Sequence, residues 1–199
     1  MYGLKSVGRI LKGSILMLAF FVVSCIEVDD IGNYWGRATL DPRLEGRWLV
    51  HTEDSEGYII FTRGEDSYVF TSGSLEDGRD IPDKSVSFIK SLEREGVDIL
   101  LARDSLSKGK NAQIFPYKIV DGRMEVFHMK SKCWGANECT RDVLEMAAEI
   151  KARGEVGASA ESPLSLEIAK LNDESLDALI YLFNHYPHWN TTIAEKTSK

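Results

Sequence analysis

A serine and a lysine three residues apart, Ser105 and Lys108, come closest in this chain to a nucleophile paired with a base. Enzymes that use such a pair place it at the start of a helix and add Ser-Asp-Asn and Lys-Thr-Gly segments. Here the pair lies in a polar turn between two expected strands, and neither companion segment occurs. Gly-x-Ser-x-Gly, a phosphate-cradling glycine loop and His-Glu-x-x-His do not occur either. The sequence therefore predicts no catalytic residue, no cofactor and no enzymatic activity.

Two groups of side chains are of types that bind metal ions, but neither has a suitable spacing. His185 and His188 are separated by Pro187, which ends a helix, so their imidazoles would not share one helix face. An acidic loop offers carboxylates, but it lacks the Asp-x-Asp-x-Asp-Gly spacing of a calcium-binding loop. The acidic residues of this loop are Glu76, Asp77, Asp80 and Asp83. We predict no metal site here, and a solvated charged loop.

His128 is a candidate for lining an internal cavity. In an extended strand it lies on the same face as Met124 and Val126, because side chains two residues apart point the same way. A polar residue on an inward face either lines a cavity or is a hydrogen-bonded histidine of the core. The sequence leaves both interpretations open.

The N-terminal segment has the three parts of a secretory signal. Three basic residues, the last of them Lys12, precede an apolar run at residues 15–23, and the small residue Ser24 follows it. A basic region, an apolar stretch of about 7–15 residues and a small residue before the cut define such signals. A membrane-spanning helix would need about 20 apolar residues, and Lys12 leaves too few. Cys25 comes directly after Ser24.

Val22-Val23-Ser24-Cys25 resembles the lipobox of bacterial lipoproteins. The resemblance implies that residues 1–24 are removed and that Cys25 carries a diacylglyceryl thioether, usually with a third, palmitate-like chain on its amine. Two or more such chains anchor a protein stably to a membrane. Ile26 in place of aspartate after the cysteine resembles an outer-membrane sorting signal. We therefore expect a lipid-anchored protein of the bacterial cell envelope, with the outer membrane favoured and the face of that membrane left open.

Lipidation of Cys25 would also decide the charge and the cysteine chemistry of the mature chain. Loss of residues 1–24 removes three positive charges and changes the formal net charge from −7 to −10, which argues against nucleic acid and anionic membrane surfaces as partners. Cys133 and Cys139 remain as an even pair in a compartment that permits disulfides. A disulfide between them would contribute about 2 kcal/mol; free thiols and a metal site are the alternatives.

The remainder of the chain first shows the pattern of short strands and then that of helices. Strands are expected at residues 47–51, 57–62, 66–71, 85–91, 97–103, 112–120 and 123–129, with a loop at 72–84. Asp121-Gly122 is the clearest hairpin signal, because a type I′ turn needs positive φ at both central residues. A helix is expected at 141–153, a short strand at 164–169 and a helix from Asn172 or Asp173 to about Tyr186.

These elements predict a mainly β (α+β) protein. The expected architecture is a small antiparallel barrel or bent meander of about eight strands, with two C-terminal helices that cover one end or side. The expected organisation is a signal peptide at 1–24, a lipidated tether at 25–43, a single domain at 44–190 and a frayed tail at 191–199. A core of this size fits one domain.

Leu44-Glu45-Gly46-Arg47-Trp48 followed by a meander resembles the Gly-x-Trp start of lipocalin-like barrels. The resemblance implies a glycine that permits a tight turn into the first strand and a tryptophan, Trp48, that plugs the closed end and could line a cavity. Residues 44–186 as a whole also resemble uncharacterised bacterial envelope lipoproteins, for which the resemblance implies no activity. One departure is that lipocalins place their main helix after strand eight, whereas here it falls after strand seven.

Two functions are consistent with these observations. The first is a non-enzymatic binding or interaction module anchored in the cell envelope, with an envelope protein as its partner. The second is a lipocalin-like carrier of a small apolar ligand, which would need an open interior of several hundred cubic ångströms, on the order of a usual ligand pocket.

Overall fold

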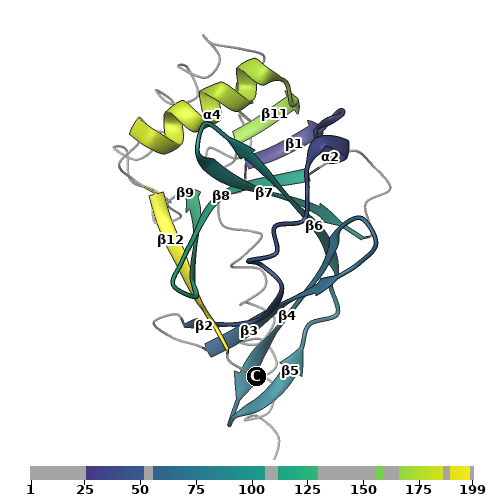
Figure 1. The fold of residues 1–199 in the computed structure, drawn as a ribbon, viewed down its shortest axis with the longest axis vertical. Coiled ribbons are helices and arrows are strands. Elements are labelled where there is room, and N and C mark those ends of the chain that lie inside the picture. The colour runs from purple at the N-terminus through teal and green to yellow at the C-terminus, as the bar shows by residue number, and fades with distance from the viewer. Residues whose placement is uncertain are drawn as a thin grey trace, which may run out of the picture.

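The computed structural model describes residues 26–51, 56–105, 112–129, 156–158, 166–185 and 189–197, and Figure 1 shows their arrangement. Within these residues the elements follow the chain in the order β1 (Ile26–Asp30), α2 (Tyr34–Arg37), β2 (Gly46–His51), β3 (Glu56–Arg63), β4 (Tyr68–Glu76), β5 (Arg79–Pro82), β6 (Ser87–Arg94), β7 (Val97–Asp104), β8 (Ala112–Val120), β9 (Arg123–Met129), β10 (Val156–Ala158), β11 (Leu166–Lys170), α4 (Asp173–His185) and β12 (Trp189–Lys196). The fold is therefore mainly β, as predicted.

Eight of the strands close into an antiparallel barrel. The order around the barrel is β2-β3-β4-β6-β7-β8-β9-β12, and β12 pairs again with β2. The remaining strands extend the sheet outside this ring, with β5 paired to β4 and the series β1-β11-β10 attached to β8. Of the two predicted architectures, a barrel or a bent meander, the structure has the barrel. The helix α4 falls between the seventh and eighth barrel strands, β9 and β12, whereas the sequence placed this helix after a strand at 164–169 as the last element.

Tight turns with positive φ connect several neighbouring strands. Asp121-Gly122, with φ of 51° and 75°, joins β8 to β9 as predicted. The same pattern occurs at Asp77-Gly78, with φ of 50° and 73°, which joins β4 to β5. The loop expected at 72–84 is therefore wrong, because most of it forms this second hairpin. The Asp77-Gly78 pair carried the same turn signal, but the surrounding charges hid the strands on either side.

We predicted a tether at residues 25–43. In the structure, residues 26–43 are instead part of the folded domain. Ile26 of β1 pairs with Ile114 of β8 on one side and with Leu166 of β11 on the other. Its side chain is only 3% exposed. The Tyr34 hydroxyl of α2 donates to Asp173 Oδ1 at 2.7 Å. The polar residues of this segment suggested a linker, yet its alternating apolar residues share an apolar core with side chains of β8 and α4.

The tail expected to fray from residue 191 is instead the strand that closes the barrel. β12 pairs with β9 over its whole length from Trp189 to Glu195 and with β2 through Ala194 to Lys196. Ala194 is 1% exposed. Without β12, the edges of β2 and β9 would each lack a partner on one side, and this pairing outweighs the tendency of a terminal segment to fray.

Two apolar cores share the strands β7 and β8. The first fills the barrel and includes Leu100 of β7. The second lies outside the barrel wall, beneath α2 and α4, and includes Ile99 and Leu101 of the same strand. Alternation along β7 therefore buries both faces of the strand. The helix α4 begins with a reciprocal cap, in which Ser175 N donates to Asn172 Oδ1 at 2.7 Å and Asn172 N donates to Ser175 Oγ at 2.9 Å.

Several predictions fall on residues outside the described ranges, among them the signal peptide at 1–24, the lipid site at Cys25, the disulfide between Cys133 and Cys139, and the helix at 141–153. Among the described residues, no helix combines the length and the apolar character that a membrane span requires.

Candidate functional site

The interior of the barrel is filled by side chains. The cavity that remains has a volume of about 20 Å³, room for about one water molecule. Its lining is entirely apolar and consists of Ile59, Phe61, Phe70, Ile89, Leu100, Ala102, Phe115, Met124 and Val126. A small-molecule pocket usually has a volume of roughly 300–1,000 Å³. Among the described residues of the barrel core, this cavity therefore leaves no space for a ligand of ordinary size.

The two residues predicted to line a cavity lie elsewhere. Trp48 is fully buried in the barrel core, and its indole N–H donates to the Leu44 carbonyl at 2.7 Å. The imidazole Nε2 of His128 lies 3.0 Å from the Thr192 hydroxyl oxygen of β12. Neither residue contributes to the small interior cavity. The position of His128 on the inward face, beyond Val126, agrees with the hydrogen-bonded interpretation.

A polar cluster binds residues 41–43 to one end of the barrel. The Asp41 side chain is 9% exposed, and it accepts the Tyr117 hydroxyl at 2.6 Å and Arg43 Nε at 2.9 Å. Arg43 also reaches Asp98, with a nitrogen–oxygen distance of 2.6 Å. The Tyr117 oxygen lies 2.7 Å from Ser91 Oγ. We predicted no role for Asp41 from the sequence, because Asp41-Pro42 is typical of the end of a linker.

The electrostatics of this cluster favour the charged carboxylate. Burial alone would raise the pKa of Asp41, but hydrogen bonds from Arg43 and Tyr117 outweigh it and hold the pKa below its usual value. Burial and the hydrogen bond to Asp41 raise the pKa of Tyr117. The hydrogen bonds to Asp41 and Asp98 raise the pKa of Arg43. These shifts keep Asp41, Arg43 and Tyr117 in their ordinary protonation states, which is typical of a structural contact.

Lys196 completes the closed end from the last barrel strand. Its Nζ donates to the Arg43 carbonyl at 3.0 Å and lies 5.2 Å from the centroid of the Trp48 ring. A cation over an indole face is attracted by the ring quadrupole. Together with the Asp41 cluster, this contact occupies the end of the barrel with protein side chains.

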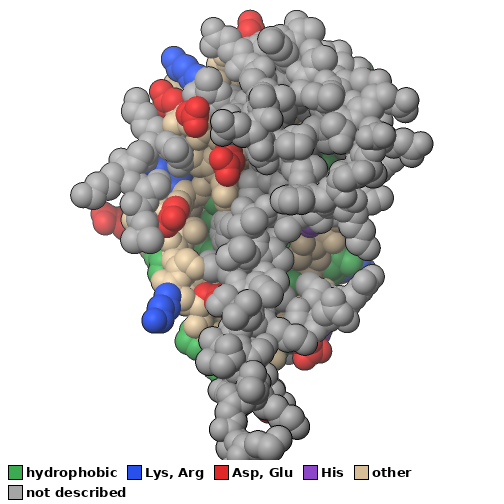
Figure 2. Space-filling model, turned by 180° about the vertical axis from the view of Figure 1, so that it is seen from behind, with side chains coloured by type: hydrophobic (Ala, Val, Ile, Leu, Met, Phe, Trp, Pro, Cys, Tyr) green, Lys and Arg blue, Asp and Glu red, His purple; other side chains and the backbone are tan. Residues whose placement is uncertain are grey.

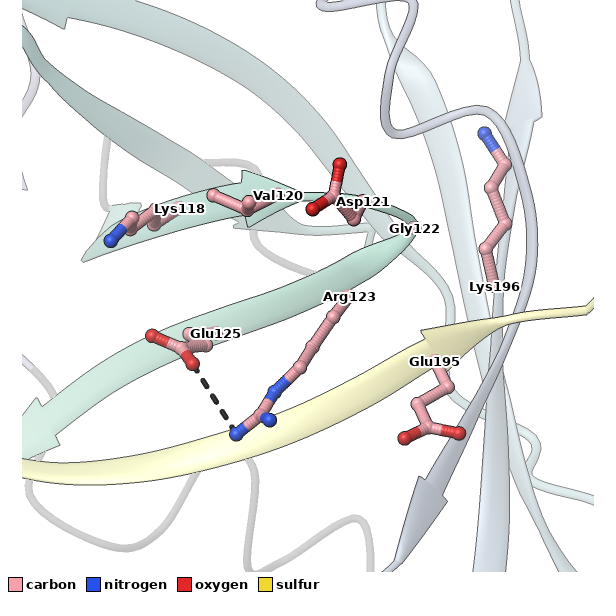
Figure 3. A pocket seen from close by; sticks show the side chains of 8 residues that line it. All are labelled: Lys118, Val120, Asp121, Gly122, Arg123, Glu125, Glu195 and Lys196. Atoms are coloured by element: carbon pink, nitrogen blue, oxygen red, sulfur yellow. Dashed lines mark ion pairs between the residues drawn. The ribbon is translucent and has the colours of Figure 1, made fainter.

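A larger pocket in the described residues lies on the outside of the barrel, where β8, β9 and β12 run side by side. Figure 3 shows the residues that line it, and its volume is about 600 Å³. We call it the wall pocket, and its lining is Lys118, Val120, Asp121, Gly122, Arg123, Glu125, Glu195 and Lys196. Val120 is 50% exposed, which is high for a large apolar side chain in a strand.

The wall pocket combines charges of both signs. Three cationic and three anionic side chains line it, so their formal charges cancel. Lys118 lies opposite Glu125 in the register of β8 and β9, and Arg123 lies opposite Glu195 in that of β9 and β12. Arg123 also pairs with Glu125 at 3.4 Å (Figure 3). The described part of the face seen in Figure 2 likewise carries acidic and basic side chains interspersed.

An aromatic group lies on the same side of β9 and β12. The ring centroids of Phe127 and Phe183 are 4.9 Å apart, and those of Phe183 and Trp189 are 5.8 Å apart, both with edge contacts. All three side chains are half-buried. Phe127 follows Glu125 on the outward face of β9, so the aromatic group continues the surface of the wall pocket toward α4.

The other residues considered for chemistry have structural partners or lie apart. Asp80 forms a two-pronged contact with Arg47, at 2.6 and 2.8 Å, and Asp83 accepts the Ser72 hydroxyl at 2.9 Å. The ring of His185 stacks on Tyr181, with the centroids 4.1 Å apart. Ser105 is described but Lys108 is not. In the described residues, no group of three or more His, Cys, Asp or Glu could hold a metal ion.

Two of the three strands that line the wall pocket, β8 and β9, were predicted from the sequence, but the third strand, β12, and the pocket itself were not. The available signal was the charge pattern around Asp121-Gly122, where Lys118 and Val120 alternate on one arm and Arg123 and Glu125 on the other. No charge pattern in the sequence marked β12 as part of this surface, and we expected its residues to fray.

The fold and this surface place the chain in the general class of closed, eight-stranded antiparallel barrels with a filled interior. Comparison with protein-family models, with curated proteins and with solved structures finds no match for the chain.

Proposed function

We propose that this chain is a lipid-anchored protein of the bacterial cell envelope that binds another envelope component through its outer surface and catalyses no reaction. Its anchor would be Cys25, at the end of the segment that resembles a lipoprotein signal peptide. The outer membrane is the favoured location, because Ile26 follows that cysteine.

The binding role is supported by the difference in volume between the cavity inside the barrel and the wall pocket outside it. The interior cavity has a volume of about 20 Å³, whereas the wall pocket has about 600 Å³. The wall pocket also offers charged groups of both signs beside an exposed valine, Val120. Recognition of a partner is therefore assigned to the outer wall.

The alternative, a carrier of a small apolar ligand inside the barrel, receives no support from this interior. A carrier would need the aromatic side chains Phe61, Phe70 and Phe115 to move out of the space that they fill. Such a change would leave most of the barrel core unpacked, and unfilled apolar space is destabilising in proportion to its volume.

Labelling with a clickable fatty acid in a lipoprotein-processing bacterium tests the anchor. We expect label on the full chain and none on the Cys25→Ser variant, while Cys133→Ser keeps it. Label that persists in Cys25→Ser would contradict the anchor.

Native mass spectrometry of the protein extracted from its own membrane tests the binding role. A retained envelope component that is lost in Lys118→Glu would support recognition by the wall pocket. A retained small apolar molecule that is unaffected by Lys118→Glu would favour the carrier instead.

A further inference from the structure

We propose that the outer wall formed by β8, β9 and β12 rests on the surface of a phospholipid bilayer with zwitterionic headgroups. This inference rests on the proposed lipid at Cys25 and goes beyond it, because it states which side of the barrel faces the membrane. It also assigns the wall pocket to lipid headgroups.

A single peptide bond joins the proposed anchor, Cys25, to the first paired residue of the sheet. Ile26 is paired on both sides and buried, and Cys25 is bonded directly to it. The Cα atoms of successive residues are about 3.8 Å apart. A lipid on Cys25 would therefore hold the bilayer within a few ångströms of this part of the sheet, and the domain could not turn freely on a tether.

The chain enters the sheet on the same strand edge that pairs with β9. Strands β1 and β9 pair with the same edge of β8, β1 up to Ile114 and β9 from Tyr117 onward. These two pairing positions are three residues apart, which corresponds to roughly 10 Å along a strand. Pro116, which has no N–H to donate, lies between them. The anchor would thus emerge at the seam between β1 and β9, four residues or roughly 13 Å along β8 from Lys118 of the wall pocket.

The surface around that seam carries aromatic side chains. Phe127, Phe183 and Trp189 form a half-buried aromatic group next to the wall pocket. Partly exposed aromatic rings on this face can contact the apolar boundary of the headgroup layer, whereas the indole N–H of Trp189 is buried within the fold. Val120, 50% exposed, adds an apolar contact at the far side of the pocket.

The charge of the wall pocket differs from that of the chain as a whole. The lipidated chain, without residues 1–24, would carry a formal net charge of −10, and an acidic surface is repelled by anionic lipid. The lining of the wall pocket is formally neutral, with as many cationic as anionic side chains. Lys118 and Arg123 can contact headgroup phosphates, and Glu125 and Glu195 can contact headgroup ammonium groups. This combination fits a zwitterionic headgroup such as phosphatidylethanolamine.

Fluorescence quenching in vesicles tests the orientation. The lipidated chain is reconstituted in vesicles of phosphatidylethanolamine and phosphatidylcholine, a fraction of which carry a nitroxide headgroup. A fluorophore is attached through Lys118→Cys in the wall pocket or through Thr62→Cys, an exposed position on β3 on another side of the barrel. The chain without an added cysteine gives the background from Cys133 and Cys139.

We expect a larger loss of emission at position 118 than at position 62. Equal losses at the two positions, or a larger loss at 62, would overturn the proposal. Because the vesicles contain no other protein, equal losses are also the result expected if this wall binds a protein instead. Intact mass measured on the same samples reports the lipid on Cys25, so a failed anchor is distinguished from a wrong orientation.

Hydrogen exchange provides a second measurement that needs no substitution. The two Asp-Gly hairpins, Asp121-Gly122 and Asp77-Gly78, have the same backbone conformation and serve as a matched pair. Transfer of the lipidated chain from detergent to zwitterionic vesicles should slow exchange around Asp121-Gly122 and leave exchange around Asp77-Gly78 unchanged. Slowing at both hairpins, or at neither, would contradict the proposed orientation.

Discussion

Replacement of Tyr117 by phenylalanine tests how the Asp41 carboxylate holds the N-terminal segment across the end of the barrel. The substitution keeps the ring, which lies in the barrel core, and removes only the hydroxyl. That hydroxyl donates to Asp41 at 2.6 Å and lies 2.7 Å from the Ser91 hydroxyl, with both partners buried. The lost interactions are thus one hydrogen bond to a charged group and one between neutral groups.

The expected loss of stability follows from these two contacts. A hydrogen bond to a charged group is worth about 1.5–3 kcal/mol, and the second contact adds about 0.5–1.5 kcal/mol. Since Asp41 keeps its contacts with Arg43, we expect a net loss of about 2–3 kcal/mol. For a chain of this size such a loss lowers the Tm by roughly 5–10 °C. Thermal unfolding followed by near-ultraviolet circular dichroism measures this loss.

The loss should also depend on pH. Folding lowers the pKa of the Asp41 carboxyl below that of the unfolded chain, about 3.9. Its contribution is therefore fully present above pH of about 3.9 and disappears as the pH falls through the lower, folded value. The difference between wild type and Tyr117→Phe should accordingly be constant near neutral pH and shrink below pH of about 4.

Tyr34→Phe is the matched control. Its hydroxyl donates to Asp173 at 2.7 Å, but Asp173 is exposed, with 60% of its side chain accessible, so water can replace the lost partner. We expect a smaller loss of stability than in Tyr117→Phe. Equal losses in the two variants, or a loss in Tyr117→Phe that is as large at pH 3 as at pH 7, would refute the reasoning.

Two further substitutions test the packing. Gly73→Ala should destabilise the fold by about 1–3 kcal/mol, because its Cβ would meet the Ile81 carbonyl oxygen and, at 2.5 Å, the Tyr58 hydroxyl. Gly36→Ala, where nothing lies within 4 Å of the added Cβ, is its control and should change stability by less than about 1 kcal/mol in denaturant unfolding. Leu176→Ala, at a site 1% exposed beneath α4, should lower the free energy of unfolding by about 2–5 kcal/mol. A single unfolding transition at a lower midpoint is expected in Leu176→Ala, and a separate early transition would show that the two cores unfold independently.

The first seven barrel strands and α4 were predictable because their signals are local. Alternation in residues 97–103 and 123–129, the Asp121-Gly122 turn and the helical spacing of Leu176, Leu179, Ile180 and Phe183 each occur within a few residues. All of them match the structure within one or two residues at each end.

The misassigned segments depend on partners far away in the chain. β1 is stable as a strand because β8 and β11 lie on its two sides, and β12 because β2 and β9 do. Read alone, Ile26 to Asp30 is a short acidic segment, and Thr191 onward is a polar end. The wall pocket was missed for the same reason, since it exists only where β12 passes beside the β8–β9 hairpin.

The position of β12 in the ring has a consequence for how the protein is made. It follows every other barrel strand in chain order, and it bridges β2, the first of them, to β9. Until residues 189–197 leave the ribosome, the sheet can curl but not close, and β2 and β9 both present free edges that can pair with another chain. A nascent chain stopped before residue 189 should therefore be a substrate for chaperones, and a chain that must cross a membrane unfolded would keep its barrel open for most of its synthesis.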